Sequence, residues 1–285
     1  IKDNLGLIEC FKNPDVKKIY LVFNFDPMQI DRDKNSYFSD NCVQFMIESL
    51  KELYQKTDKK LLFTYGNYQD IIPELLKALG VKYLYLNQDY TPYSIKRDAL
   101  IEKICLDNDC QFHSFNDIML TDIEIPKKPD NTYYSQFSSY LNKAMETKIK
   151  DLDYHDISTK ITMVPKLKKI KCKITSKKLN GFYNHNPDIN VNGGRILAKK
   201  ILKNISQQKD YDKLRGLCDY KSTHLSAYIK FGCVSIREVY HSFVNALGID
   251  SGLVKQLYWR EFYYYLIYHY PETYTEKKGL KKAYQ

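Results

Sequence analysis

The stretch LLFTYGNYQDIIPELLKALG, residues 61–80, contains a strand and a helix whose limits can be set from the sequence alone. Residues 61–65 are a short apolar run typical of a buried strand, and the apolar residues of 68–79 recur with the period of a helix. Gly80 stands where helices commonly end, because glycine adopts the left-handed conformation at little cost. This strand–helix unit decides the fold, because it is repeated on both sides.

Upstream of this unit, IYLVFNF (19–25) predicts a buried strand and residues 39–56 predict an amphipathic helix with Ser39 as its N-cap. Downstream, YLYL (83–86) predicts a strand, residues 92 to about 107 a helix opened by Thr91 and Pro92, and QFHSF (111–115) a further strand. This alternating order predicts a doubly wound parallel sheet of the Rossmann-like kind. No GxGxxG or GxxxxGK[ST] motif follows any strand, so the sequence gives little support to dinucleotide or P-loop binding.

The pattern changes after residue 124. Residues 125–192 are rich in Lys pairs, Asn and Gly and predict a long connection, with Tyr134, Phe137 and Tyr140 anchoring part of it on a domain surface. From Gly194 the sequence becomes helical, and Ser235 with Glu238 has the spacing of a capping box. We therefore expect an α/β domain over 1–124, a linker over 125–192 and an all-α domain over 193–285.

The segment Asp219–Arg237, DYKSTHLSAYIKFGCVSIR, combines hydroxyls, a histidine and basic residues with an expected helix start. Ser222 and Thr223 fall at or just inside that start, where unpaired backbone N–H groups favour an anion such as a pyrophosphate. Ser226 would add a hydroxyl one turn from Ser222. An ordinary N-cap with surface hydroxyls is the alternative, and for this segment alone it is the commoner case.

A second polar stripe follows in the helix that Asp250 and Ser251 open. Gln256, Trp259, Arg260 and Tyr263 have the spacing of a single helix face. An amide, the only Trp, a guanidinium and a phenol on one face could stack a base and hold a phosphate. The alternative is a buried aromatic face, while Leu253, Leu257, Tyr264 and Ile267 are available for core contacts.

The composition of the chain indicates a class of binding partner and a cellular compartment. The formal charge of +10 and the pI near 9.0 indicate a polyanionic partner or a lysine-rich solvated surface. Seven scattered Cys without a CxxC motif predict a reducing compartment, and the six His show no metal-ligand spacing. Without a signal peptide or a long apolar span, we expect a soluble intracellular protein; nucleus, cytoplasm and virion all stay open.

Several motifs, in one order along the chain, resemble the photolyase/cryptochrome family. The most specific are STHLSAYIKFG, VSIREVY and QLYWREFYYYL; the others are IKDNLGL, FNFDPMQI, SDNCVQFMIESLKEL, NQDYTPYSIKRD, YYSQFSSY and NGGRILAKKIL. The resemblance runs from the first residue to the last. It implies an α/β antenna-type domain followed by an all-α FAD-binding domain that is incomplete here. In the family a strand precedes IKDNLGL, and a further helical block follows the Trp259 helix.

The resemblance also assigns residues. Ser222, Thr223, Leu225 and Ser226 match positions that bind the flavin phosphates; Tyr211 matches a Tyr against the cofactor; and His224 stands where some relatives have an Arg. Trp259 matches an aromatic residue that packs on a flipped-out pyrimidine dimer. Arg260 follows it, and we expect Arg260 to contact both the cofactor and the DNA. Tyr263 is expected beside them at the lesion. Gln256 replaces the Glu common in cyclobutane-dimer photolyases and is commoner in the (6-4) and cryptochrome branches.

An antenna chromophore of folate or deazaflavin type would lie near Asn87, Asp89 and Tyr90, at the carboxyl end of a strand. Thr91 replaces a folate-binding Glu found in some members. The family's electron-transfer Trp chain has no counterpart in a sequence with one Trp, so no residue of this chain is assigned a catalytic role. A separate polypeptide completing the helical domain is one expectation.

The implied function is light-dependent repair of cyclobutane pyrimidine dimers in double-stranded DNA, with reduced FAD as the electron donor. Two alternatives stay open: a cryptochrome-type photoreceptor or (6-4) photolyase, and a non-catalytic remnant that binds DNA without flavin.

Overall fold

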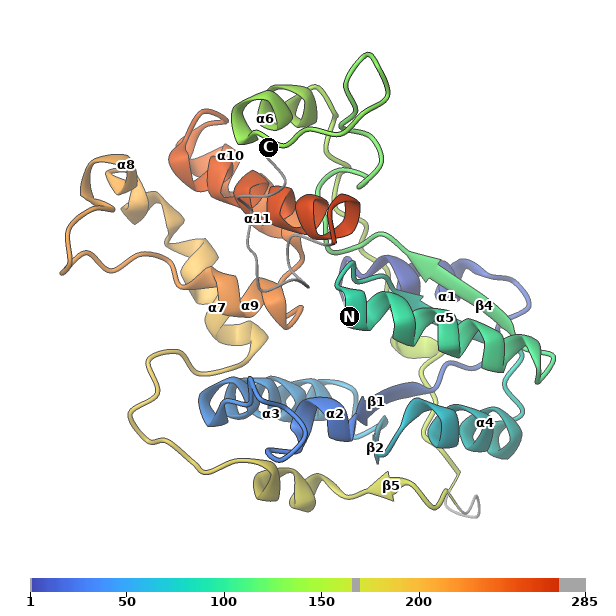
Figure 1. Ribbon diagram of the computed structural model, residues 1–285. Helices are drawn as coiled ribbons and strands as arrows, with labels where there is room; N and C mark the ends of the chain where they lie inside the picture. Colours follow the sequence, from blue (N-terminus) through green and yellow to red (C-terminus); the bar gives the residue numbers. More distant parts are fainter. Residues whose placement is uncertain (1, 166–169, 272–285) are drawn as a thin grey trace.

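The computed structural model describes residues 2–165 and 170–271. An α/β part and a helical part lie side by side and are joined by the segment that follows residue 124 (Figure 1). Helix α1 (Leu5–Lys12) precedes the α/β part, in which strands and helices follow in the order β1 (Leu21–Phe25), α2 (Pro27–Ile30), α3 (Asp40–Lys56), β2 (Leu61–Tyr65), α4 (Tyr68–Leu79), β3 (Tyr83–Asn87), α5 (Pro92–Leu106) and β4 (Gln111–Phe115).

The predicted elements and caps in this part are confirmed, although β1 begins at Leu21 and not at Ile19. Ser39 and Thr91 accept hydrogen bonds from the N–H groups of Cys42 and Ser94 at the starts of α3 and α5. Gly80 ends α4 in the left-handed region with φ of 63°. Local signals suffice here because the residues that cap these three helix ends lie within four positions of the groups they satisfy.

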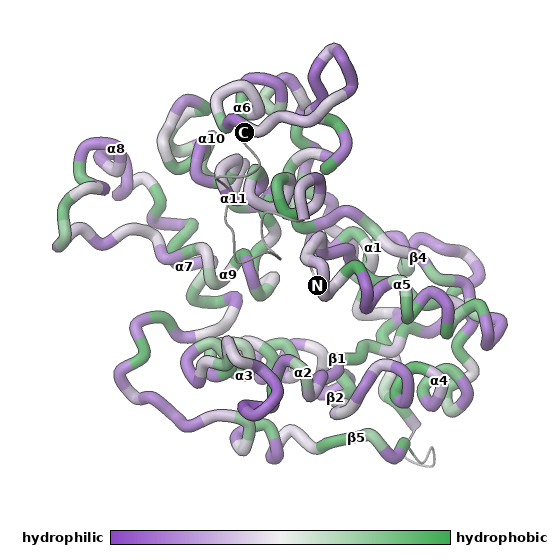
Figure 2. Tube along the Cα trace, in the orientation of Figure 1, coloured by the Kyte–Doolittle hydropathy of each residue, from purple (hydrophilic) through white to green (hydrophobic). Residues whose placement is uncertain are grey.

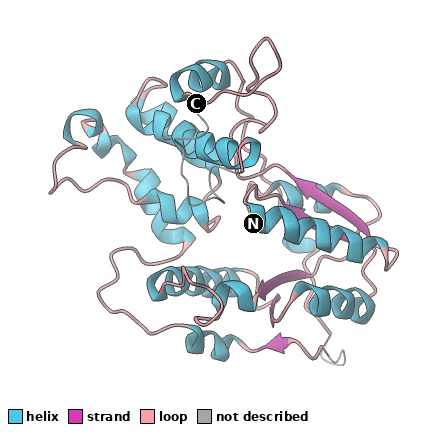
Figure 3. Cartoon of the chain, in the orientation of Figure 1, coloured by secondary structure: helices cyan, strands magenta, loops and turns pink. Residues whose placement is uncertain are grey.

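The strands form two groups, where the alternating order had predicted one sheet (Figure 3). β1 pairs with β2 in parallel and β3 with β4 in parallel, while the short β5 (Lys173–Ile174) adds to β2 in the antiparallel sense. Among the described residues no backbone ladder joins β1 to β3. Instead, side chains of the segment from Leu7 to Ile19 pack against Leu21 of β1 and Tyr83 of β3, so hydrophobic contacts hold the two groups together.

Residues of the predicted linker are buried in the hydrophobic cores of both the α/β part and the helical part. It contains α6 (Phe137–Met145), the 3₁₀ helices η1 (Ile157–Thr159) and η2 (Ser176–Phe182), and β5. Leu179 of η2 is fully buried in the core between α3 and β2, and Tyr140 of α6 is fully buried in the helical core. The expected anchoring by Phe137 and Tyr140 is therefore confirmed.

The helical part contains α7 (Arg195–Lys203), η3 (Ile205–Gln208), α8 (Tyr211–Leu214), α9 (Leu225–Lys230), α10 (Ile236–Leu247) and α11 (Gly252–His269). Its core extends beyond these helices, because Phe45 of α3 and the segment around Leu120 pack into it. Hydrophobic and hydrophilic residues are interspersed along each helix in Figure 2. In the described part of the chain no helix is long and apolar enough to cross a membrane.

Candidate functional site

The Ser222–Ser226 segment turns sharply before α9 begins. His224 is the N-cap with φ of 51° and ψ of 20°, and the Thr223 hydroxyl accepts a hydrogen bond from the Leu225 N–H at 3.3 Å. The left-handed backbone at His224 interrupts the helical path, so Ser222 and Thr223 precede the helix. The prediction that Ser222 and Ser226 lie one turn apart on a single helix is therefore wrong. Leu225 is buried in the helical core, whereas Ser226 is exposed.

A groove of about 430 Å³ brings three of the predicted residues together. Ser222, Thr223 and His224 line it, together with Lys200 of α7. None of the lining residues is acidic; the rest are Asn190, Val191, Asn192, Leu197, Ile201, Asn204, Ile205, Gln207, Gln208 and Tyr228. Hydroxyl, amide and ammonium donors without a carboxylate form a set that suits phosphate oxygens.

Two predicted cofactor residues lie elsewhere. Tyr211, in α8, packs at the edge of the helical core, with its ring 6.3 Å from that of Tyr220, and it is not among the groove residues. The Arg260 guanidinium donates to the Ile118 carbonyl oxygen at 2.6 Å and lies 4.8 Å from the centre of the Tyr264 ring. A half-buried guanidinium needs acceptors, and a backbone carbonyl with an aromatic face supplies them here. The structure thus ties Arg260 to the segment after β4, a contact that sequence spacing does not reveal.

The predicted polar stripe lies on α11 as expected. Gln256 and Trp259 are half-buried, and Tyr263 is 52% exposed. Phe137 of α6 stacks on Trp259, with ring centres 3.6 Å apart and planes 12° apart, and Phe262 meets the indole edge-on at 6.0 Å. These contacts fix the plane of the indole, and the Tyr263 ring also stacks on it, 5.8 Å away at 30°. The aromatic packing expected for this helix is therefore confirmed, and the role of the stripe in binding a base stays a prediction.

Glu261 is a residue of this region that sequence reasoning missed. Its carboxylate, 1% exposed, accepts hydrogen bonds from the N–H groups of Leu120 and Thr121, the Thr121 hydroxyl and, at 3.0 Å, the Tyr140 hydroxyl. Burial raises the pKa of Glu261, an effect that these donors only partly offset. The sequence feature that could have indicated its burial is the spacing of four residues from Leu257 and from Tyr265, which places Glu261 on the apolar face of α11.

The expected antenna residues are engaged within the protein. The Asn87 side chain accepts from the Gly6 N–H at 2.9 Å and donates to Asp117 at 2.8 Å. Tyr90 is buried and its hydroxyl reaches Gln88, while Asp89 caps the Thr91 N–H at 3.1 Å. An antenna held by these side chains would have to replace bonds that join α1, β3 and the loop after β4, so this site fits a second chromophore poorly.

Ser235 caps α10 as predicted, with the Glu238 N–H donating to its hydroxyl at 2.9 Å, but the reciprocal half of the capping box is absent. The Glu238 carboxylate instead accepts from Arg195 at 2.8 and 2.9 Å and from Lys199 at 2.9 Å. Burial alone would raise the pKa of Glu238, but these hydrogen bonds and charges lower it below its usual value of 4.5. The carboxylate thus joins α10 to α7, beside the groove.

This arrangement predicts an acid-dependent loss of stability. Because the folded-state pKa of Glu238 is below the unfolded one, its contribution is complete above about pH 5 and disappears as the pH falls through the folded pKa. We expect the Glu238→Gln variant to be less stable than the parent at pH 7 and to approach it at pH 3. Urea unfolding of both proteins across this range tests the point; a difference that does not change with pH would contradict it.

Among the described residues, no group of three or more His, Cys, Asp or Glu is arranged to hold a metal ion. All seven cysteines have free thiols.

The profile of the DNA photolyase family matches residues 1–158, more than half of the 285 residues. The chain is 22% identical over 293 aligned residues to a deoxyribodipyrimidine photo-lyase of Synechococcus and 25% identical over 268 to cryptochrome-2 of Gallus gallus. These alignments cover 95% and 79% of this chain and 59% and 43% of the relatives. The chain belongs to the DNA photolyase family, in which photolyases and cryptochromes share one architecture.

Solved structures agree on the fold. An archaeal photolyase from Sulfolobus tokodaii, whose structure holds two FAD molecules, superposes with a TM-score of 0.76 at 26% identity. A class III photolyase from Agrobacterium tumefaciens gives 0.80 at 17% identity. Each superposition covers 96% of this chain and 58% of the other. The chain thus spans about six-tenths of the length of these relatives, and the comparisons give no support to a separate polypeptide that completes it.

Proposed function

We propose that this chain carries the flavin-phosphate and lesion-binding surfaces of a light-dependent photolyase that repairs cyclobutane pyrimidine dimers in DNA. The observation that carries the proposal is the half-exposed Trp259, held in plane by Phe137 and flanked on α11 by Gln256 and Tyr263. A rigid indole with an amide and a phenol on the same helix face suits an unstacked pyrimidine, because stacking supplies affinity and the polar groups supply orientation.

The groove at Ser222–His224 is the second support. Its donor set fits the phosphates of FAD, with Ser222 and Thr223 as hydroxyl donors and Lys200 as the cation. When bound, reduced FAD supplies the light-driven electron transfer that opens the dimer. The chain's own residues hold its phosphates, and Trp259 and Gln256 orient the flipped-out pyrimidine dimer. Lys and Arg side chains of the helical part would bind the DNA phosphates, so affinity should fall with salt.

Gln256 favours one competing function, a (6-4) photolyase or cryptochrome-type photoreceptor. Its amide can donate as well as accept, whereas a Glu carboxylate only accepts. For a dimer repair enzyme, Gln256→Glu should raise repair of cyclobutane dimers. For the competing function, the variant should leave dimer repair absent and, in a (6-4) enzyme, should lower repair of that lesion.

The experiment that tests the proposal is repair under blue light. The purified chain is reconstituted with FAD, reduced, and illuminated with a duplex that contains one thymine dimer or one (6-4) lesion. Dimer loss that needs both light and FAD supports the proposal. Flavin absorption without repair of either lesion favours the photoreceptor, and DNA binding without flavin absorption favours the non-catalytic remnant.

Because Trp259 is the only Trp, its fluorescence reports on lesion binding directly. We expect a duplex with one thymine dimer to quench this emission and to bind at least fivefold more tightly than the undamaged duplex, since base stacking contributes about 1–3 kcal/mol. The Trp259→Leu variant should lose that preference when binding is followed by fluorescence anisotropy of labelled DNA. Arg260→Gln is the matched control, because the Arg260 side chain is engaged with Ile118; an unchanged preference in Trp259→Leu would reject the assignment.

A further inference from the structure

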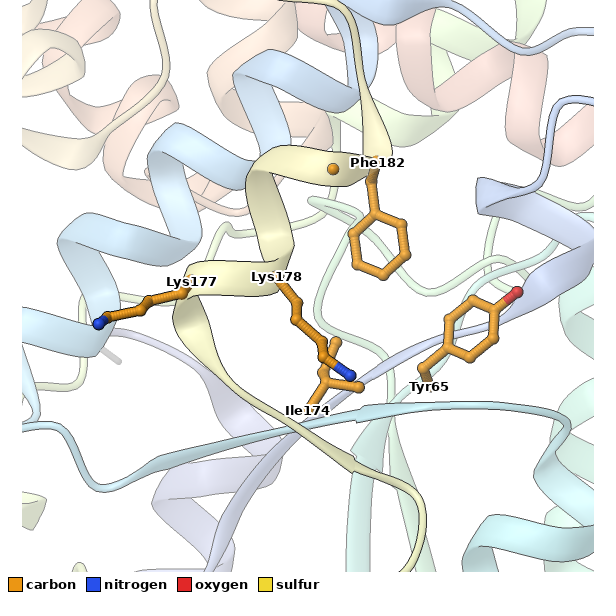
Figure 4. A pocket seen from close by; sticks show the side chains of 6 residues that line it. Tyr65, Ile174, Lys177, Lys178 and Phe182 are labelled. Atoms are coloured by element: carbon orange, nitrogen blue, oxygen red, sulfur yellow. The ribbon is translucent and has the colours of Figure 1, made fainter.

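A second hollow lies at the opposite end of the molecule from α11, where the linker crosses the carboxyl end of β2. Its volume is about 460 Å³, within the range of small-molecule sites. The walls are Tyr65 at the end of β2, Ile174 of β5, and Lys177, Lys178, Gly181 and Phe182 of η2 (Figure 4). It shares no residue with the groove at Ser222–His224.

The aromatic wall of this hollow is held from the core. Phe182 stacks on the buried Phe25, with ring centres 5.0 Å apart and planes at 27°, and on Tyr65 at 5.7 Å and 20°. The Tyr65 N–H donates to the Cys172 carbonyl oxygen at 3.0 Å, which fixes the backbone beneath the ring. Tyr65 is nevertheless 37% exposed. A fixed, partly exposed ring at the end of an aromatic stack is a surface on which a further flat ring can stack.

The rim of the hollow is basic. Lys177 and Lys178 are exposed, none of the six wall residues is acidic, and within the described residues neither lysine forms an ion pair. Lys178 extends over Ile174 toward Tyr65, whereas Lys177 points away from the opening (Figure 4). An ammonium close to a stacking surface matches a ligand whose phosphate is attached near a flat ring.

We propose that this hollow binds a nucleoside monophosphate, with its base stacked on Tyr65 and its phosphate bound by Lys178. Ile174 of β5 and residues of η2 border the hollow together with Tyr65 of β2. Its occupation would also hold η2 against the end of β2, because the ligand contacts both elements.

The test uses the whole chain and AMP as the probe, titrated by calorimetry, with adenosine as the phosphate-free comparison. We expect AMP to bind at least fivefold more tightly than adenosine. Lys178→Ala should abolish this difference, because it removes the cation. Tyr65→Leu should weaken both ligands at least fivefold, while Tyr65→Phe should retain binding because the ring is kept.

Two control variants separate this hollow from other cationic sites. Lys173→Ala removes an exposed lysine of β5 that does not line the hollow, and Lys200→Ala alters the groove at Ser222–His224. Lys173→Ala should bind AMP like the parent, and Lys200→Ala should keep the difference between AMP and adenosine. Absence of AMP binding, AMP binding that survives Tyr65→Leu and Lys178→Ala, or binding lost in Lys200→Ala would overturn the proposal. Binding of the octanucleotide dT8 that exceeds AMP binding tenfold would overturn it in favour of a single-strand surface.

Discussion

Replacing Arg237 with methionine is expected to lower the free energy of unfolding by about 3–5 kcal/mol, because it leaves two carboxylates in the interior without their cation. The Arg237 guanidinium lies 3.0 Å from the Asp3 carboxylate and 2.5 Å from that of Asp117. It also donates to the backbone oxygens of both residues. The side chains of Arg237 and Asp3 are 4% and 1% exposed, so water cannot replace the lost bonds.

Urea unfolding of the parent and the Arg237→Met variant measures this difference. Arg32→Met is the matched control, because Arg32 pairs with Asp40 at the surface and is 47% exposed. An exposed pair of this kind contributes at most about 1 kcal/mol. Equal losses of unfolding free energy in the two variants would contradict this prediction, because the buried network would then add no more stability than an exposed ion pair.

The second large effect is expected at Glu261. Glu261→Leu should destabilise the protein by about 3 kcal/mol or more, because the N–H groups of Leu120 and Thr121 and the Tyr140 hydroxyl lose a buried acceptor. Glu261→Gln keeps a carbonyl oxygen at the same place, and the Thr121 and Tyr140 hydroxyls can rotate to accept from its amide. We therefore expect the loss in Glu261→Gln to be less than half of that in Glu261→Leu.

The pH dependence of this pair of variants gives a second test. A carboxyl group whose pKa is raised on folding contributes stability that is complete below its unfolded pKa and lost as the pH rises through the folded pKa. Glutamine does not titrate. The difference between the parent and Glu261→Gln should therefore shrink from pH 4 toward pH 8 in urea unfolding. A difference that grows over this range would mean that the folded pKa lies below the unfolded one.

The two acids on α10 and α11 show why the sequence predicts elements better than partners. Glu238 has capping-box spacing, yet its carboxylate binds Arg195 and Lys199, which stand about forty positions away. Glu261 lies next to the predicted stripe, yet it binds residues about 140 positions away. Local spacing fixes which helix face a side chain occupies, but what covers that face depends on packing.

In the candidate site, too, the sequence predicts which residues share a helix face or a segment, but not the residues that pack against them. The sequence placed Gln256, Trp259 and Tyr263 on one face of a helix, and it grouped Ser222, Thr223 and His224. It did not indicate that Arg260 turns to Ile118, that Lys200 completes the groove or that Phe137 stacks on Trp259. Each of these contacts joins residues of different helices or loops, which helix periodicity alone does not bring together.

The sequence by itself determined the alternation of strands and helices over residues 18–115, the caps at Ser39, Gly80 and Thr91, and the family. These depend on periodicity and on residues within one helical turn, where the chain's own geometry sets the neighbours. Only the tertiary structure decided that the strands form two groups, that the linker enters both cores and that Arg237 and Glu261 are buried. Those outcomes depend on contacts between residues that are distant in the sequence, from about 30 to more than 200 positions apart, which no local pattern encodes.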